Sequence, residues 1–96
     1  MLEDLDPLLH SQLRLSVMSL LVSVESADFV YLLEQTEASK GNLSVQISKL
    51  KDAGYISVEK SFRNNYPLTS CSITPQGLDA FEQYVRAISG YLNLDR

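Results

Sequence analysis

The spacing of apolar residues changes twice along this chain, and these changes limit the folds that it can adopt. Up to Ala53 apolar residues recur every three or four positions, which is the period of an amphipathic helix. In residues 55–62 they alternate, with Ile56 and Val58 on one face, as in a strand. Helical spacing returns after Thr74. The chain is therefore predicted to be α+β and mostly α, with helices on both sides of one β-hairpin.

Size and composition indicate one compact domain over residues 1–96, because 45% of the 96 residues are hydrophobic. The longest apolar stretch, residues 13–24, is interrupted by polar residues and is shorter than the ~18 residues of a membrane-spanning helix. The acidic N-terminus is unlike a secretory signal. The lone cysteine, Cys71, excludes an internal disulfide. We therefore expect a soluble, cytoplasmic protein.

Three helices are predicted before the hairpin. The first spans about residues 11–24, with Ser11 as its N-cap, and it is apolar around more of its circumference than one buried face requires. The second follows the N-cap Asp28 and ends near Thr36. The third covers about residues 40–53 and is bounded by Ser39 as its N-cap and Gly54 after its last turn.

The hairpin and the last helix follow directly. Strands are predicted at residues 55–62 and 68–73, with a polar turn over residues 63–67. Thr74 is the expected N-cap of the last helix, and Pro75 suits its first position because that position needs no free N–H group. The apolar stripe expected along this helix consists of Leu78, Phe81, Val85, Ile88 and Leu92, widened by Tyr84 and Tyr91.

The second and third helices, joined by a tight turn, are typical of a helix-turn-helix over about residues 28–53. Leu43, Ile47 and Leu50 recur at helical spacing and are expected to face inward. Asn and Gln amides can pair with adenine in the major groove, and a lysine can reach guanine or a phosphate. The outward residues of the third helix are Asn42, Ser44, Val45, Gln46, Ser48 and Lys49.

The charges are unevenly distributed along the chain, whose net charge is −4. Residues 39–63 contain five cations and two carboxylates, a net charge of +3, and the remaining residues carry −7. Such a basic segment is expected of a DNA-facing surface, although ordinary variation in surface charge would explain it equally well. Lys40 favours DNA, because a cation at a helix N-terminus opposes the helix dipole and a docked phosphate would remove that penalty.

Three stretches of the chain resemble MarR- and ArsR-related winged-helix regulators. Residues 39–56 are similar to their recognition helix and first wing strand, and residues 73–81 to the start of their last helix. Residues 5–15 resemble the opening of a small single-domain subgroup. The joint spacing of three motifs is more specific than any one alone. The resemblance implies a winged helix-turn-helix with three helices, a β-hairpin wing over about residues 55–73 and a C-terminal helix over about residues 75–92.

The resemblance also implies sequence-dependent binding to double-stranded DNA and regulation of transcription, which we interpret as repression. In the recognition helix the expected DNA contacts are Ser39, Lys40, Asn42, Ser44, Val45, Gln46 and Lys49. In the wing they are Lys60, Arg63, Asn64 and Asn65.

A homodimer through the terminal helices is expected, because the apolar stripe of the last helix would otherwise form a large exposed patch. The alternative is that the last helix folds back and covers the first helix of its own chain. A twofold dimer would space two recognition helices ~34 Å apart, matching a palindromic operator. The expected interface residues are Leu13, Val17, Phe81, Tyr84, Val85, Ile88, Tyr91 and Leu92.

Neither a metal site nor an enzyme is predicted. His10 and Cys71 are two ligands at most, whereas a zinc site needs three or four. Cys71 is expected in the core, and His10 is expected to make a local hydrogen bond or cap before the first helix. The carboxylates show no convergent pairing and no cofactor motif is present. Tyr55, Tyr84 and Tyr91 could line an effector pocket, but packing is the favoured explanation, so no small-molecule effector is indicated.

Two other functions compete with DNA binding. Winged-helix folds also serve as protein–protein adaptors, and the acidic net charge favours that reading. The polar outer face of the third helix favours DNA instead. An RNA-binding winged helix is disfavoured, because few exposed aromatic residues are expected near the basic segment.

Overall fold

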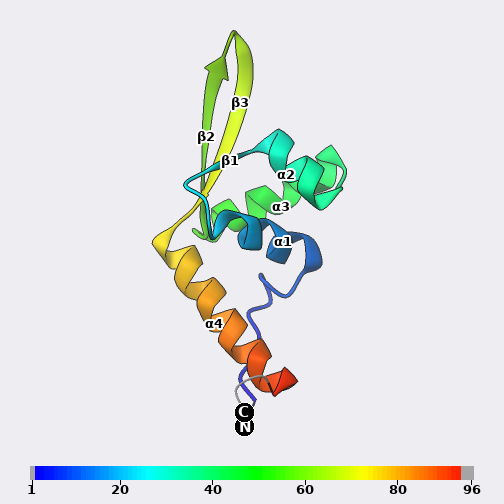
Figure 1. Ribbon diagram of the computed structural model, residues 1–96, viewed down its shortest axis with the longest axis vertical. Helices are drawn as coiled ribbons and strands as arrows, with labels where there is room; N and C mark the ends of the chain where they lie inside the picture. Colours follow the sequence, from blue (N-terminus) through cyan, green and yellow to red (C-terminus); the bar gives the residue numbers. More distant parts are fainter. Residues whose placement is uncertain (1, 94–96) are drawn as a thin grey trace.

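The computed structural model describes residues 2–93, so Met1 and residues 94–96, with the cation Arg96, lie outside the described part. The predicted mostly helical α+β fold is confirmed, with a three-stranded antiparallel sheet in the order β1-β3-β2 (Figure 1). The elements are α1 (Gln12–Leu21), β1 (Ala27–Asp28), α2 (Phe29–Thr36), α3 (Lys40–Asp52), β2 (Ile56–Arg63), β3 (Tyr66–Ile73) and α4 (Pro75–Leu92).

Three of the four predicted N-caps are confirmed. The side chains of Asp28, Ser39 and Thr74 accept hydrogen bonds from backbone N–H groups in the first turns of α2, α3 and α4. Each bond satisfies a donor that the helix itself leaves free. Ser11 was expected to do the same for α1, and this was wrong, because its side chain makes no capping hydrogen bond.

The first helix is shorter than predicted, because α1 ends at Leu21 rather than near Val24. The chain must turn there to bring Ala27 beside Cys71, where β1 pairs with β3. Ala27 is buried in that position. Burial and the sheet hydrogen bonds of β1 thus replace the last turn that helical periodicity predicts. A strand of two residues is too short for its own period to be recognised in the sequence.

The hairpin is longer and its turn tighter than predicted. Only Asn64 and Asn65 form the turn, with φ angles of 51° and 67°, and Arg63 pairs with Tyr66 in the strands. Two consecutive left-handed residues suit a two-residue hairpin turn, and asparagine tolerates that conformation better than most residues. The expectation that residues 63–67 all belong to the turn is therefore corrected.

The core lies where α1, α2, α3 and the base of the sheet meet. The inward residues predicted for α3, Leu43, Ile47 and Leu50, are all buried there, together with Cys71. The hairpin and α4 project from opposite ends of this body (Figure 1), and the molecule measures 53 × 25 × 22 Å. Among residues 2–93, no helix is long and apolar enough to cross a membrane.

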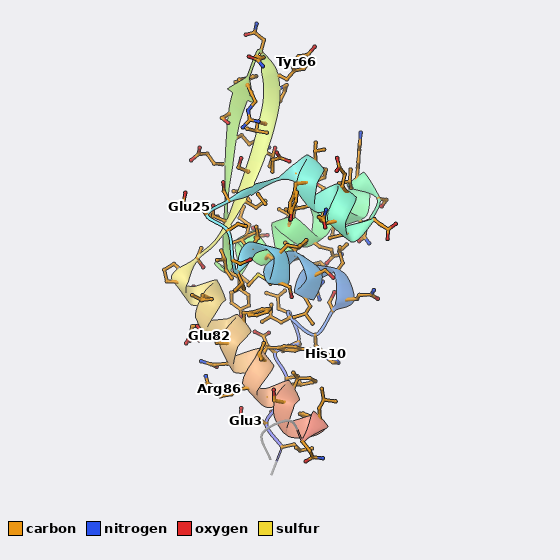
Figure 2. The ribbon with its side chains drawn as sticks, viewed as in Figure 1. Glu3, His10, Glu25, Tyr66, Glu82 and Arg86 are labelled. Atoms are coloured by element: carbon orange, nitrogen blue, oxygen red, sulfur yellow. The ribbon has the colours of Figure 1, made fainter. Side chains whose placement is uncertain are left out.

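The N-terminal segment, residues 2–10, is tied to the body by three tyrosine hydroxyl groups. Tyr55 donates to Asp6 at 2.5 Å and Tyr91 donates to the backbone oxygen of Glu3 at 2.8 Å. Tyr84 shares a hydrogen bond of 3.0 Å with Nδ1 of His10, and Figure 2 labels His10 beside α4. His10 was expected to make a local hydrogen bond or cap, and this is corrected, because its partner lies 74 positions away in the sequence. The three tyrosine hydroxyl groups are therefore used in hydrogen bonds to the protein's own N-terminal segment.

Candidate nucleic-acid interface

The outer face of α3 is polar and open. Asn42, Ser44 and Lys49 are exposed, and Val45 lies between them with 52% of its surface exposed. Lys40 occupies the first position of the helix and is exposed, as is the N-cap Ser39. Since Ser39 Oγ accepts a hydrogen bond from the Asn42 N–H at 3.2 Å, its own hydroxyl proton stays available to a phosphate.

Gln46 differs from its neighbours on α3 because it is only partly exposed. Its side-chain oxygen accepts a hydrogen bond from the Arg14 guanidinium of α1, and its Nε2 donates to Asn42 Oδ1 at 3.0 Å. Arg14 also donates from Nε to the Leu8 oxygen at 2.5 Å. Sequence reasoning missed Arg14, because nothing in the local pattern connects residues that are 32 positions apart.

A groove of about 320 Å³ separates α3 from the wing. Lys51 of α3 lies along one side, and Lys60 of β2 lies along the other with its cross-strand partner Thr69. Ser44 and Ser48 add hydroxyl groups on the helix side, above an apolar base. Cations and hydroxyl groups are the side chains that most often contact a DNA backbone. Lys51, Ser48 and Thr69 were not among the expected site residues.

The wing presents its residues in two directions. Alternation along β2 puts Lys60 and Phe62 on the face toward α3, and Arg63 on the opposite face. Figure 2 shows Tyr66 at the far end of the hairpin, and Phe62 and Tyr66 are each 75% exposed. The expectation of few exposed aromatic residues near the basic segment is thus corrected. The turn residues Asn64 and Asn65 are exposed at the tip.

Of the residues that α4 buries, two are small and only one belongs to the predicted apolar stripe. Gly77, Tyr84 and Ala87 are buried against the body, whereas Val85 is 44% exposed and Leu92 is 60% exposed. The apolar stripe therefore lies along the edge of the buried face, partly against the core and partly exposed to solvent. Sequence periodicity could not show this, because both sides of the helix carry apolar residues.

The residues expected at a dimer interface fall into three groups in the single chain. Val17 and Tyr84 are buried in the chain's own core, so almost none of their surface is left for a partner to cover. Leu13, Phe81 and Ile88 are half-buried against that core. Exposed positions are held by Val85, Tyr91 and Leu92.

An apolar groove of about 620 Å³ runs along α4 and the end of α1. It is lined by Val22, Leu78, Phe81, Glu82, Val85, Arg86 and Ser89. Of these residues, Val22, Leu78, Glu82, Arg86 and Ser89 were not expected at an interface.

The sequence that forms α2, α3 and the hairpin lies within a match to a known family model. The model is described as a winged helix DNA-binding domain, and it matches residues 13–92. The chain belongs to this family. In this family α3 is the second helix of the helix-turn-helix, and that position accounts for its polar outer face.

The chain is also similar to individual proteins along most of its length. An uncharacterized protein of Methanocaldococcus jannaschii is 32% identical over 79 residues, which cover 82% of this chain and 86% of that protein. Among solved structures, the winged-helix domain resembles a transcriptional regulator homologue from Pyrococcus horikoshii. The TM-score is 0.84 at 23% identity, over 93% of this chain and 89% of the other.

A MarR-like fold is also confirmed. The zinc-responsive MarR family member ZitR of Lactococcus lactis matches with a TM-score of 0.60 at 17% identity, over 88% of this chain and 59% of its own. The family is described by DNA binding, and these two structural neighbours are described as transcriptional regulators, so none of them is described as an enzyme. Within residues 2–93 no group of three or more His, Cys, Asp or Glu side chains is placed to hold a metal ion.

Proposed function

We propose that the chain is a transcriptional repressor that binds a specific double-stranded DNA site as a homodimer. The groove between α3 and the wing is the observation that carries this proposal. Lys51 and Lys60 approach it from opposite sides, and Ser44, Ser48 and Thr69 add hydroxyl donors. A phosphate strand lying there would meet cations on both sides, and the outer face of α3 would point into the adjacent major groove.

Sequence readout is assigned to the exposed side chains of α3. Asn42 and Lys49 lie seven positions apart and therefore share one face of the helix. Amide and ammonium groups hydrogen-bond to base edges, whereas Ser44 and Lys40 suit the sugar-phosphate backbone. In the wing, Lys60 faces the same side as α3. Arg63 and the Asn64–Asn65 turn are assigned to the next segment of the DNA backbone.

The apolar groove of α4 supports the dimer. Val22, Leu78 and Val85 are exposed around it, and a second copy of the chain would remove their apolar surface from water. The α4 helix has 18 residues, so it is ~27 Å long. It projects from the body (Figure 1), which leaves its outer face open along most of that length.

The charges on α4 favour a twofold arrangement. Glu82 and Arg86 lie four positions apart at this groove and point away from the body on the same side of the helix (Figure 2). In a twofold interface the same patch meets itself, so Glu82 of one protomer can face Arg86 of the other. The twofold axis would repeat this ion pair, so the interface would contain it twice.

Repression is the simplest outcome of such binding, because a dimer on a site that overlaps a promoter blocks access to it. Selection from a random duplex library tests the whole proposal. We expect the bound duplexes to converge on a palindrome whose half-sites are centred about one helical turn apart. Enrichment of single half-sites would contradict the dimer, and failure to enrich any duplex would contradict the function.

A protein–protein adaptor is the second candidate, favoured by one observation at the wing tip. Phe62 and Tyr66 are each 75% exposed, and aromatic residues are enriched in protein interfaces. The two functions separate in a double substitution, Phe62→Ser with Tyr66→Ser. An adaptor would lose its partner, whereas a DNA-binding protein would keep its affinity for the selected duplex within about threefold, because Phe62 offers no hydrogen bond to a phosphate and Tyr66 at most one, which a serine hydroxyl can also make.

A further inference from the structure

Three side chains form a relay of hydrogen bonds from α1 to the recognition helix. Arg14 of α1 donates to Gln46 Oε1, and Gln46 Nε2 donates to Asn42 Oδ1 at 3.0 Å. The guanidinium is itself held by the Leu8 oxygen, which accepts from Nε at 2.5 Å. The relay thus begins at a fixed backbone atom and ends on the exposed face of α3.

The direction of every bond in this relay follows from the first residue. A guanidinium can only donate hydrogen bonds, so the amide of Gln46 must turn its oxygen toward Arg14. Its nitrogen then faces Asn42 and must meet an oxygen there, which fixes the orientation of the second amide as well. Asn42 is left with its Nδ2 group, and hence two N–H donors, directed away from Gln46.

This polarity changes which bases the helix can read. Bidentate pairing of an amide with adenine needs both an acceptor and a donor, because adenine offers N7 and its N6 amino group. The Gln46 oxygen and the Asn42 oxygen already accept hydrogen bonds within the relay. Each of these oxygens keeps one lone pair, whereas the free donors are the two N–H groups of Asn42 Nδ2, the second N–H of Gln46 Nε2 and the ammonium of exposed Lys49. Guanine presents two acceptors, O6 and N7, in the major groove.

We propose that Arg14 makes the amides on the reading face of α3 present mainly donors, which selects guanine over adenine at the base read by Asn42. Arg14 and Gln46 are positioning residues, and Asn42 touches the base. This inference rests on the proposed function, namely that α3 enters the major groove of duplex DNA. It replaces the expectation that Asn42 and Gln46 each pair with adenine.

The test is selection from a random duplex library with wild type and five variants. The base read by Asn42 is the position whose preference disappears with Asn42→Ala. At that position wild type is expected to favour guanine over adenine by about tenfold, the size of one lost base contact. Arg14→Met keeps an apolar stem but no donor, so both amides can turn over and the preference should fall to about one.

Two further variants separate orientation from mere structural support. Arg14→Lys retains a donor and should keep guanine preferred. Gln46→Glu accepts from both Arg14 and the Asn42 amide nitrogen, which turns Asn42 Oδ1 outward. Its preference should move to adenine and cytosine, whose amino groups donate in the major groove. Gln35→Glu makes the same change on exposed α2 and should leave the wild-type preference intact.

The outcomes distinguish this inference from the function on which it rests. If wild type enriches duplexes but prefers adenine at the Asn42 position, or if Arg14→Met keeps the guanine preference, the relay does not set readout and the proposed function stands. If wild type enriches no duplex, both are overturned. Far-ultraviolet circular dichroism of each variant checks that its helices are intact. Gln46→Glu decides the question if Arg14→Met does not fold.

Discussion

A Cβ atom on Gly77 would lie 2.0 Å from the backbone oxygen of Tyr55, so the first turn of α4 packs directly on the backbone between α3 and β2. The neighbouring N-cap Thr74 reinforces this contact, because its backbone N–H donates to the same oxygen at 3.1 Å. The glycine in the sequence stretch at the start of the last helix therefore has a physical role: it permits the approach that sets the direction of α4.

Gly77→Ala is expected to destabilise the protein by about 1–3 kcal/mol, because the methyl group meets backbone that can move only with the whole helix. Chemical denaturation measures the free energy of unfolding. Gly41→Ala is the control, since no atom lies within 4 Å of a Cβ there. That change should stabilise by about 0.5–1 kcal/mol through helix propensity. Equal effects of the two substitutions would contradict the packing of α4 described above.

The second prediction concerns the phenol of Tyr55 at high pH. Its hydrogen bond to Asp6, its burial and the charge of Asp6 raise its pKa from 10.0 to about 12. The folded state therefore holds this proton more tightly than the unfolded chain. The resulting stability is fully present below pH 10 and is lost as the pH rises through about 12.

Spectroscopic titration of tyrosine ionisation measures that pKa, with Tyr55→Phe identifying the signal. Asp6→Ala removes both the acceptor and the charge, so the titration of Tyr55 should move down toward 10.0. Asp4→Ala removes a charge from an exposed position in the same segment and should leave it in place. An unchanged titration in Asp6→Ala would show that Asp6 does not hold Tyr55.

Cys71 is predicted to be inert while the protein is folded. It is fully buried, and burial raises the pKa of its thiol from 9.0 to about 11, so little thiolate forms near neutral pH. A water-soluble disulfide reagent should react with it about a hundredfold more slowly than with a cysteine placed by Ser26→Cys at an exposed position. Similar rates for the two thiols would support a redox-sensing role instead.

The dimer is best tested at Val85 rather than at Ile88, because Ile88 packs against the core and a charge there would disturb the fold as well as an interface. Val85 is 44% exposed and lines the α4 groove. Val85→Asp should therefore leave a folded monomer in sedimentation at micromolar concentration. Val30→Asp is the control, since Val30 is exposed on α2, and should remain dimeric. A monomeric wild type would exclude the homodimer.

Local signals in the sequence predicted most of the fold. Asp28, Ser39 and Thr74 are short polar residues that each precede a stretch of helical apolar spacing, and each caps its helix. Ser11 stands at the N-cap of α1 with the same local pattern but makes no such bond, so the pattern alone does not determine the cap. Strand β1 was missed because it has only two residues, and they form a strand only by pairing with β3.

The candidate site was predicted less completely, because its geometry depends on contacts between distant residues. Polar residues on the outside of α3 followed from periodicity. The relay through Arg14 and the groove that pairs Lys51 with Lys60 required the helices and hairpin to be placed in space. The inward side of α4 was misjudged, because Gly77 and Ala87 pack more closely than the larger residues that hydrophobicity ranks higher.

Binding to duplex DNA as a function of salt concentration tests the central claim most directly. Fluorescence anisotropy with a labelled random duplex should give an affinity that falls linearly with salt on logarithmic axes, with a slope of about 0.9 for each phosphate contact. Lys51→Ala and Lys60→Ala should each reduce the slope by about one contact, and Lys51→Arg should restore it. No binding at low salt, or a slope unchanged in both alanine variants, would contradict the proposed interface.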